Sequence, residues 1–142
     1  PLFLFLLEVP IVYITSNRTI RAPFRSKVKI TALVQINSGF PNVTQTKWQM
    51  LRNGIETDID ITESRYNGTT TDLFNPMLVI NDVNFHQDNG SAFQLAAYNS
   101  AGWRRSFNVS KVFVIPGIFI HPSIHISLSL SLSLSLSLFA FN

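Results

Sequence analysis

Three histidines are the side chains of this sequence best suited to proton transfer or metal binding. His86 lies in the run Asn84-Phe85-His86-Gln87-Asp88 and is the sole histidine between residues 9 and 116. This composition is typical of a surface turn and supplies no partner for a general base, so we expect His86 to be a surface residue. His121 and His125 are spaced so that one helical face could carry two metal ligands, but no third ligand accompanies them.

A small acidic group follows the Asn53-Gly54 pair and consists of Asp58, Asp60 and Glu63. A calcium site needs more converging oxygen ligands than this spacing offers, so we expect a solvated edge strand here. The chain has no cysteine, which excludes disulfides, thiolate zinc sites and cysteine nucleophiles. It also has no glycine-rich phosphate loop and no G-x-S-x-G elbow. These observations predict a protein that is not an enzyme and that carries neither a metal nor a cofactor.

The segment between Glu8 and Glu56 has no acidic residue and contains a basic stretch near its start. The members of this stretch are Arg18, Arg21, Arg25, Lys27 and Lys29. A basic stripe of this kind could meet an acidic protein, a glycosaminoglycan or nucleic acid. The net charge of +3 is too small for the dense patch of a nucleic-acid-binding protein. We therefore expect no nucleic-acid partner, and an ordinary solvated face with an adjoining loop.

Trp103, Arg104 and Arg105 are the best candidates for a binding surface. They follow a predicted hairpin at 99–102, and tryptophan beside arginine is typical of the residues that dominate protein interfaces. In the alternative interpretation, Trp103 packs on the outer face of a sheet or on a neighbouring domain.

Five N-x-S/T sequons occur in the chain, which is more than its content of serine and threonine would give by chance. They begin at Asn17, Asn42, Asn67, Asn89 and Asn108. Their number favours an extracellular or cell-surface protein, whose glycans would cover the turns. The absence of cysteine favours the cytoplasm instead, because proteins of oxidising compartments usually contain disulfides. We expect the extracellular setting and keep the cytoplasmic one as the alternative.

The side chains named above must be positioned by short strands, because the chain contains short segments of alternating apolar and polar residues separated by residues typical of turns. The 142 residues are 46% hydrophobic and 13% charged, which is suited to one folded domain. Over 28–35, Val28, Ile30, Ala32 and Val34 alternate with their neighbours, and this period predicts a strand whose Val/Ile/Ala face points inward. Further strands are expected over 47–52, 55–61, 76–80, 93–98 and 103–115, with tight turns at 53–54, 67–68, 88–90 and 99–102. The pattern predicts an all-β, antiparallel sandwich of seven to eight strands over residues 9–116.

The order and spacing of three motifs resemble the immunoglobulin superfamily, in particular its I-set-like domains. Trp48 stands at the position of the core tryptophan of that family, Leu78 to Val83 match its L-x-I-x-x-V stretch, and Ala97 to Gly102 match its A-x-N-x-x-G hairpin. The resemblance implies an immunoglobulin-like sandwich and places six side chains at its centre. These are Ala32, Trp48, Leu78, Ile80, Phe93 and Leu95. The style of the sequence also resembles fragments of large multi-domain invertebrate proteins.

The sequence departs from the family pattern at its disulfide. Ala32 and Leu95 stand at the two cysteine positions, and Phe93 stands at the position of a tyrosine whose hydroxyl usually closes a corner. Asp88 and Gly90 lie one residue too far from Phe93, which predicts a one-residue insertion or a bulge. The other register would place Gln94 in the core, which its polar amide disfavours. Loss of a bridge across about sixty residues forfeits roughly 4 kcal/mol, so packing must compensate.

The two ends of the chain differ from the middle in composition. Residues 1–8 begin with the apolar run PLFLFLL, and residues 117–142 contain six Ser-Leu pairs from Ser127 to Leu138. A CT dinucleotide repeat encodes Leu-Ser without end, so our hypothesis is that residues 9–116 are one exon and that both ends are translated intron. A truncated signal peptide, a membrane helix in the tail and a tail that adds a strand to the sandwich are the alternatives. We expect the apolar leader to lie outside the domain and the tail to be low-complexity sequence.

These observations favour a non-catalytic protein-recognition or spacer module of a cell-surface, adhesion-type protein. Its expected partners are another protein or neighbouring immunoglobulin-like domains, and a membrane would be reached only through other parts of a longer chain or through the tail. The alternative is an intracellular structural or interaction module, for which a core without cysteines is no handicap.

Overall fold

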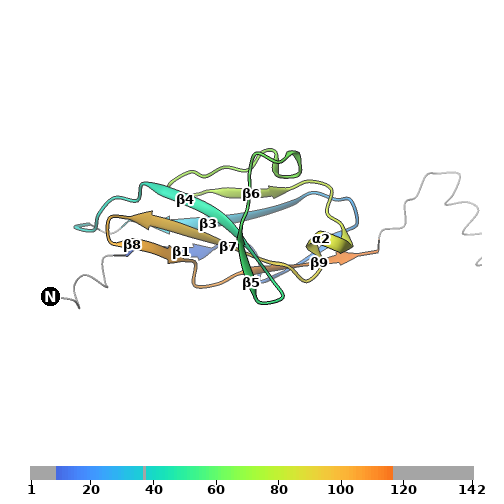
Figure 1. The fold of residues 1–142 in the computed structure, drawn as a ribbon. Coiled ribbons are helices and arrows are strands. Elements are labelled where there is room, and N and C mark those ends of the chain that lie inside the picture. Colours follow the sequence, from blue (N-terminus) through green and yellow to red (C-terminus); the bar gives the residue numbers. More distant parts are fainter. Residues whose placement is uncertain (1–8, 37, 117–142) are drawn as a thin grey trace, which may run out of the picture.

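The computed structural model describes residues 9–36 and 38–116, which form nine strands and two short helical segments (Figure 1). The strands are β1 (Ile11–Ile14), β2 (Thr19–Pro23), β3 (Val28–Gln35), β4 (Gln45–Arg52), β5 (Ile55–Asp58), β6 (Met77–Ile80), β7 (Ala92–Asn99), β8 (Gly102–Arg105) and β9 (Ser110–Ile115). The helical segments are the 3-10 turn η1 (Ser64–Tyr66) and the helix α2 (Phe85–Asp88). Among the described residues, no helix has the length and apolar character needed to cross a bilayer.

Two sheets face each other in this part of the chain. One has three strands in the order β1-β3-β6, and the other has the order β2-β9-β7-β4-β5 with β8 paired to β7. All neighbours are antiparallel except β2 and β9, which run parallel. The parallel pair arises because the chain leaves the first sheet after β1 and joins the second sheet as β2. The predicted all-β sandwich is confirmed.

The core lies between the sheets and is filled by the alternate residues of the longer strands. In β3, Val28, Ile30, Ala32 and Val34 are buried, as the period of two predicts, while the intervening side chains point outward. Trp48 of β4 is fully buried and lies opposite Leu95 of β7 in the ladder. Four further side chains placed at the centre by the family resemblance belong to the same buried cluster, namely Ala32, Leu78, Ile80 and Phe93.

The segment before Phe93 accommodates its additional residue without a bulge in the strand. From Ala92 to Tyr98, β7 pairs with β4 in an unbroken register, so the extra residue lies in the turn at 89–91. Phe93 and Leu95 therefore face the core, and Gln94 faces outward. Gln94 is nevertheless only 4% exposed, and its amide donates a hydrogen bond to Gln49, the residue opposite it in the ladder.

Three predicted elements differ from the structure in extent. The strand expected over 103–115 is interrupted at 106–109, which divides it into β8 and β9 and raises the number of strands to nine. The strand expected over 55–61 ends at Asp58, because Asp60 begins a turn in which its carboxylate accepts a hydrogen bond from the Thr62 N–H. The turn expected at 88–90 is preceded by α2, whose last residue is Asp88.

The segment between β8 and β9, residues 106–109, binds the edge strand β1 and so connects the two sheets. The side-chain amide of Asn108 accepts a hydrogen bond from the Ile14 N–H at 2.7 Å and donates one to the Ile14 carbonyl at 2.8 Å. One amide side chain thus replaces a strand partner, and the Phe107 N–H adds a bond to the Val12 carbonyl. Because an unpaired edge is a template for aggregation, this contact also protects β1.

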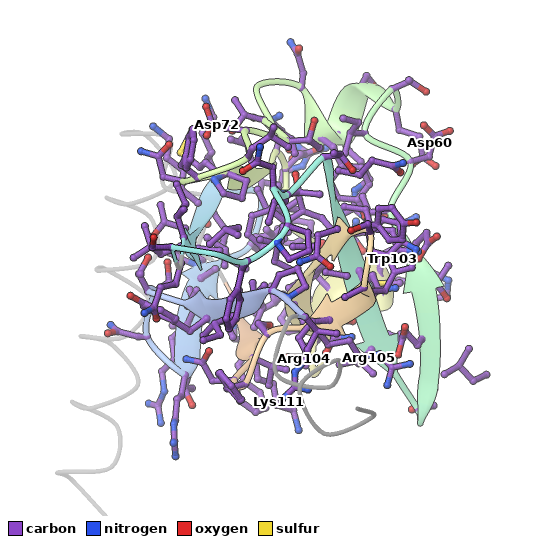
Figure 2. The ribbon with its side chains drawn as sticks, turned by 90° about the vertical axis from the view of Figure 1, so that its left-hand side faces the viewer. Asp60, Asp72, Trp103, Arg104, Arg105 and Lys111 are labelled. Atoms are coloured by element: carbon purple, nitrogen blue, oxygen red, sulfur yellow. The ribbon has the colours of Figure 1, made fainter. Side chains whose placement is uncertain are left out.

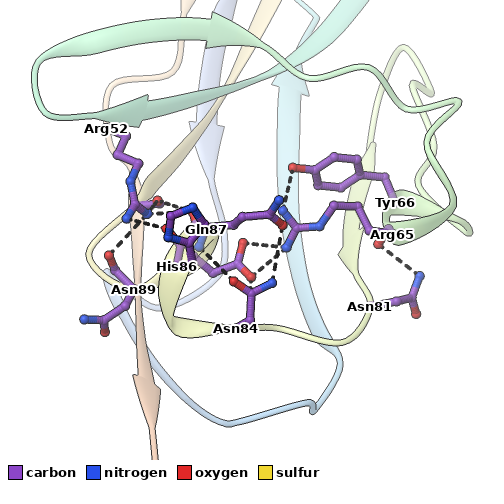
Figure 3. A network of polar contacts seen from close by, with 10 residues as sticks. Arg52, Arg65, Tyr66, Asn81, Asn84, His86, Gln87 and Asn89 are labelled. Atoms are coloured by element: carbon purple, nitrogen blue, oxygen red, sulfur yellow. Dashed lines mark hydrogen bonds and ion pairs between the residues drawn. The ribbon is translucent and has the colours of Figure 1, made fainter.

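A network of hydrogen bonds and an ion pair holds the segment around α2 at one end of the sandwich (Figure 3). Asp88 is fully buried and accepts two hydrogen bonds from the Arg65 guanidinium, at 2.7 and 2.6 Å. Arg52 donates to the carbonyls of His86 and Gln87 at the end of α2. A buried carboxylate is strongly unfavourable without such a partner, so Arg65 and Asp88 must be present together.

Replacement of Trp48 by alanine should leave a cavity at the centre of the core. We expect Trp48→Ala to lower the free energy of unfolding by about 3–5 kcal/mol, because it leaves a cavity and removes the hydrogen bond from the indole N–H to the Thr70 carbonyl. Trp103→Ala is the matched control, since Trp103 is 43% exposed, and should cost about 1 kcal/mol or less. Urea unfolding followed by circular dichroism measures both, and equal losses would contradict this core.

Replacement of Asn108 tests whether its side chain pairs with β1. We expect Asn108→Ala to lower the free energy of unfolding by about 1–3 kcal/mol, because the buried Ile14 N–H and carbonyl both lose their partner. Asn17→Ala removes another sequon asparagine, but one whose side chain is exposed, and should change stability little. If urea unfolding gave the same midpoint for the two variants, the proposed role of Asn108 would be wrong.

Candidate recognition face on the six-stranded sheet

The outward face of the larger sheet carries most of the predicted binding residues. Because Trp48 and Leu95 point into the core, their neighbours along β4 and β7 point outward, and β8 and β5 extend the same face. We use the term recognition face for eight of these residues. They are Lys47, Gln49, Glu56, Asp58, Gln94, Tyr98, Trp103 and Arg105.

Trp103 lies at the centre of a cation and aromatic cluster on this face. Its ring lies 5.2 Å from the ring of Tyr98, the residue opposite it in the ladder, at an interplanar angle of 45°. The ammonium group of Lys47 lies 4.3 Å from the centre of the Trp103 ring. The indole is therefore held on one side by a ring and on another by a cation, while 43% of its surface remains exposed. An aromatic side chain held in this way loses little conformational entropy on binding a partner.

A chain of hydrogen bonds extends from the middle of the recognition face to its rim. Gln94 donates to Gln49 at 3.0 Å, and Gln49 donates to Asp58 at 2.9 Å. Lys47 contributes a third polar contact by donating to the second oxygen of Asp58 at 3.2 Å. The hydrogen bond from Gln49 and then that from Lys47 hold the pKa of Asp58 below its ordinary value. Asp58 is thus anionic at neutral pH, and its charge orients Lys47 beneath Trp103.

The charges on this face alternate in sign. Arg105 forms an ion pair with Glu56 at 2.9 Å, and its side chain remains largely exposed. Together with Lys47 and Asp58, this pair gives the face two cations and two anions around a partly apolar centre. Such a surface is suited to a protein partner with an apolar anchor and a mixed-charge rim, and is less suited to a polyanion.

Arg104 lies on the other side of the sheet from Trp103 and Arg105. The three residues are consecutive in β8, so alternation sends the side chain of Arg104 away from the recognition face, and its guanidinium lies 5.4 Å from the centre of the Phe107 ring. Figure 2 shows the three residues from the end of the sandwich, with Lys111 of β9 below them. The predicted binding residues are therefore divided between two surfaces.

The remaining predicted candidates do not converge on a site for chemistry. His86 is exposed in α2, and its backbone carbonyl makes the contact with Arg52. Asp60 binds the N–H and the hydroxyl of Thr62, which keeps its pKa below the ordinary value, and it lies apart from the recognition face. Within the described residues, no three acidic or histidine side chains gather as a metal site would require. His121 and His125 lie outside the described residues.

The basic stretch is divided between the two sheets. Arg21 of β2 lies beside Phe113 of β9 on the larger sheet, whereas Lys29 of β3 lies on the outward face of the smaller one. Arg25, in the turn between them, forms an ion pair with Asp82 at 3.6 Å. Arg21 and Lys29 therefore lie on different sheets, and Arg25 pairs with an acidic residue.

The five sequons differ in their surroundings. At Asn17 and Asn42, both the asparagine and the threonine two residues later are exposed. Asn67 and Asn89 are exposed too, but Thr69 bonds to β6 and Ser91 is fully buried. Asn108 uses both atoms of its amide to bind β1, so a glycan there would require this contact to break.

Sequence reasoning missed the two arginines that hold the end around α2. Arg52 and Arg65 lie 13 positions apart in the sequence, and both reach the segment that precedes β7. The available signal was Asp88, because an acidic residue shortly before a buried strand needs a cation as its partner if it is buried too. The sequence alone did not indicate which arginine that would be.

Comparison with solved structures supports the fold. No family model and no curated protein matches the chain. Among solved structures, 843 chains match, and one of them is described as the structure of murine CRIg. It superposes with a TM-score of 0.52 at 15% sequence identity, over 75% of this chain and 98% of that one. Together with the sheet order and the buried tryptophan, this likeness shows that the described residues form an immunoglobulin-like β-sandwich.

Proposed function

We propose that this chain is a non-catalytic, I-set-like recognition module of a multi-domain cell-surface protein, which binds a protein partner through the recognition face. The observation that carries the proposal is the half-exposed Trp103, held between Tyr98 and Lys47 on a paired sheet. Exposed tryptophans that are fixed in place often dominate the binding energy of protein interfaces. The adhesion-type role and an invertebrate parent protein rest on the sequence pattern and on fold-level analogy.

The arrangement of charges supports a protein as the partner. The polar groups of the face already pair with one another, so a partner can cover them without leaving an unpaired charge. A partner would then gain most from covering Trp103 and Tyr98. The partner is expected to present an apolar or aromatic side chain surrounded by charges of both signs.

Substitutions on the two sides of β8 test this proposal. We expect Trp103→Ala to weaken binding by about 30-fold or more, the loss typical of a dominant interface residue. Arg104→Ala is the matched control, because it changes the adjacent residue of the same strand but leaves the recognition face intact. The measurement is binding of each tetramerised, dye-labelled variant to an array of purified ectodomains and to immobilised copies of this chain. A partner that is lost with Arg104→Ala and retained with Trp103→Ala would contradict the proposed face.

The alternative function is that of an intracellular structural or interaction module, and glycosylation separates the two. When the chain is directed into the secretory pathway of a eukaryotic cell, we expect glycosidase treatment to increase its electrophoretic mobility. Asn17→Gln and Asn42→Gln should each remove part of this shift, because these sequons are open on the folded surface, whereas Asn108→Gln should remove none. A chain that folds there without any glycan would favour the intracellular alternative.

A further inference from the structure

The two edges of the larger sheet carry opposite charges. Within the described residues, its strand order begins with β2 and ends with β5. Arg21 belongs to β2 and Arg18 precedes it, whereas Glu56 and Asp58 belong to β5. Neither arginine forms an ion pair within residues 9–36 and 38–116. Because an edge strand is a template for another strand, the charges along it select which strand it accepts.

In β5, the backbone groups of Glu56 and Asp58 face the open side of the sheet. The N–H of Ile59, the residue after the strand, donates to the Trp48 carbonyl of β4 at 2.9 Å. The direction of the hydrogen bonds alternates along a strand, so Thr57 also bonds toward β4. The N–H and carbonyl groups of Glu56 and Asp58 therefore point away from β4, while their side chains lie on the recognition face.

In β2, the backbone groups of Thr19 and Arg21 face the open side in the same way. The Arg18 carbonyl, just before the strand, accepts a bond from β9 at 2.7 Å, and the Phe24 N–H, just after it, donates to the Ile115 carbonyl at 2.9 Å. These bonds direct the even-numbered residues toward β9, so the N–H and carbonyl groups of Thr19 and Arg21 point away from it. Both side chains are exposed on the outward face of the larger sheet.

We propose that β2 of one copy of this chain pairs with β5 of a second copy, so that the larger sheet continues from copy to copy. The strands β2 and β5 run in opposite directions within the sheet. Copies in the same orientation therefore meet as an antiparallel pair, with their outward faces on the same side. The free backbone groups match when Arg21 lies opposite Glu56 and Thr19 lies opposite Asp58.

The side chains agree with this register. Residues opposite one another in a ladder share a face, so the Arg21 guanidinium meets the Glu56 carboxylate of the neighbouring copy. Glu56 already lies 2.9 Å from Arg105 of its own chain, but a carboxylate has lone pairs for a second cation. Pro23, which has no N–H, falls opposite Gly54 in the turn between β4 and β5, beyond the last hydrogen bond that the pair requires.

Pairing of like edges is less suited to these strands. Two β5 strands joined through their free groups would place Glu56 or Asp58 of one copy opposite a carboxylate of the other, which is destabilising. Two β2 strands would gather the arginines of both copies at one contact. Pairing of β2 with β5 uses a different edge toward each neighbour, so copies add in an open row. Such a row leaves Trp103 uncovered, and the inference does not rest on the proposed function.

Exchange of the two charges between chains tests this pairing. The full 142-residue chain is produced without glycans, because Asn17 lies two residues before β2 and a glycan there would obstruct the contact. We expect Arg21→Glu and Glu56→Arg each to weaken self-association by about tenfold, because like charges would lie opposite one another. An equimolar mixture of the two variants should recover it, because each contact between unlike variants joins an arginine to a glutamate. Sedimentation velocity at low salt measures association, and circular dichroism establishes that each variant is folded.

Two further variants separate this contact from other causes of association. Lys29→Glu makes the same change of charge on the outward face of the smaller sheet and should leave association unchanged. Trp103→Ala should also leave it unchanged, and a loss would assign the association to the recognition face instead. Residues 1–8 and the Ser-Leu tail lie outside the described residues, and association through them would not follow the exchange of charges. A wild-type chain that stays monomeric, or a mixture that associates no more than its components, would overturn the proposal.

Disulfide formation tests the register independently, because the chain has no cysteine. Under mild oxidation, chains with Thr19→Cys and chains with Asp58→Cys should form a mixed disulfide, since opposite residues of a ladder lie within the range that a disulfide spans. The matched control replaces Asp58→Cys by Glu63→Cys, which removes one exposed carboxylate outside β5. We expect the first mixture to react about tenfold faster than the control. Equal rates for the two mixtures would overturn the proposal.

Discussion

The burial of Trp48 between the two sheets is the interaction on which the rest of this molecule depends. No disulfide joins the sheets, since the chain contains no cysteine, and Ala32 and Leu95 occupy the positions where the family resemblance implies one. The indole fills the space beside them, and its N–H binds the Thr70 carbonyl in the segment that leads to β6. One side chain thereby ties the larger sheet to the smaller one by packing and by a hydrogen bond.

A sandwich held by packing must also close its edges, and here side chains do so in place of strands. Asn108 pairs with the backbone of β1, and the hydroxyl of Thr69 both donates to and accepts from the backbone of Val79 in β6. Each contact satisfies backbone groups at the border of the three-stranded sheet. The buried pair of Arg65 and Asp88 fixes the loop before β7, which in turn sets the register of β7 against β4. Polar groups thus specify the arrangement that the apolar core stabilises.

The register of β7 against β4 also determines which side chains form the recognition face. The inward direction of Trp48 requires Lys47 and Gln49 to point outward, and the pairing of Tyr98 with Trp103 follows from the hairpin between β7 and β8.

The sequence by itself determined the features that depend on local period and on residue type. The alternation over 28–35 identified β3 and its buried face, the Asn53-Gly54 pair identified the hairpin between β4 and β5, and the lone tryptophan before that hairpin identified the core. Only the tertiary structure decided which polar residues meet. Asn108 is 94 positions from Ile14, and Arg65 is 23 positions from Asp88, so no local pattern links them. It also placed Trp103 beside the ammonium group of Lys47, 56 positions earlier in the chain, because the contacts of a side chain depend on which strands pair and in which register.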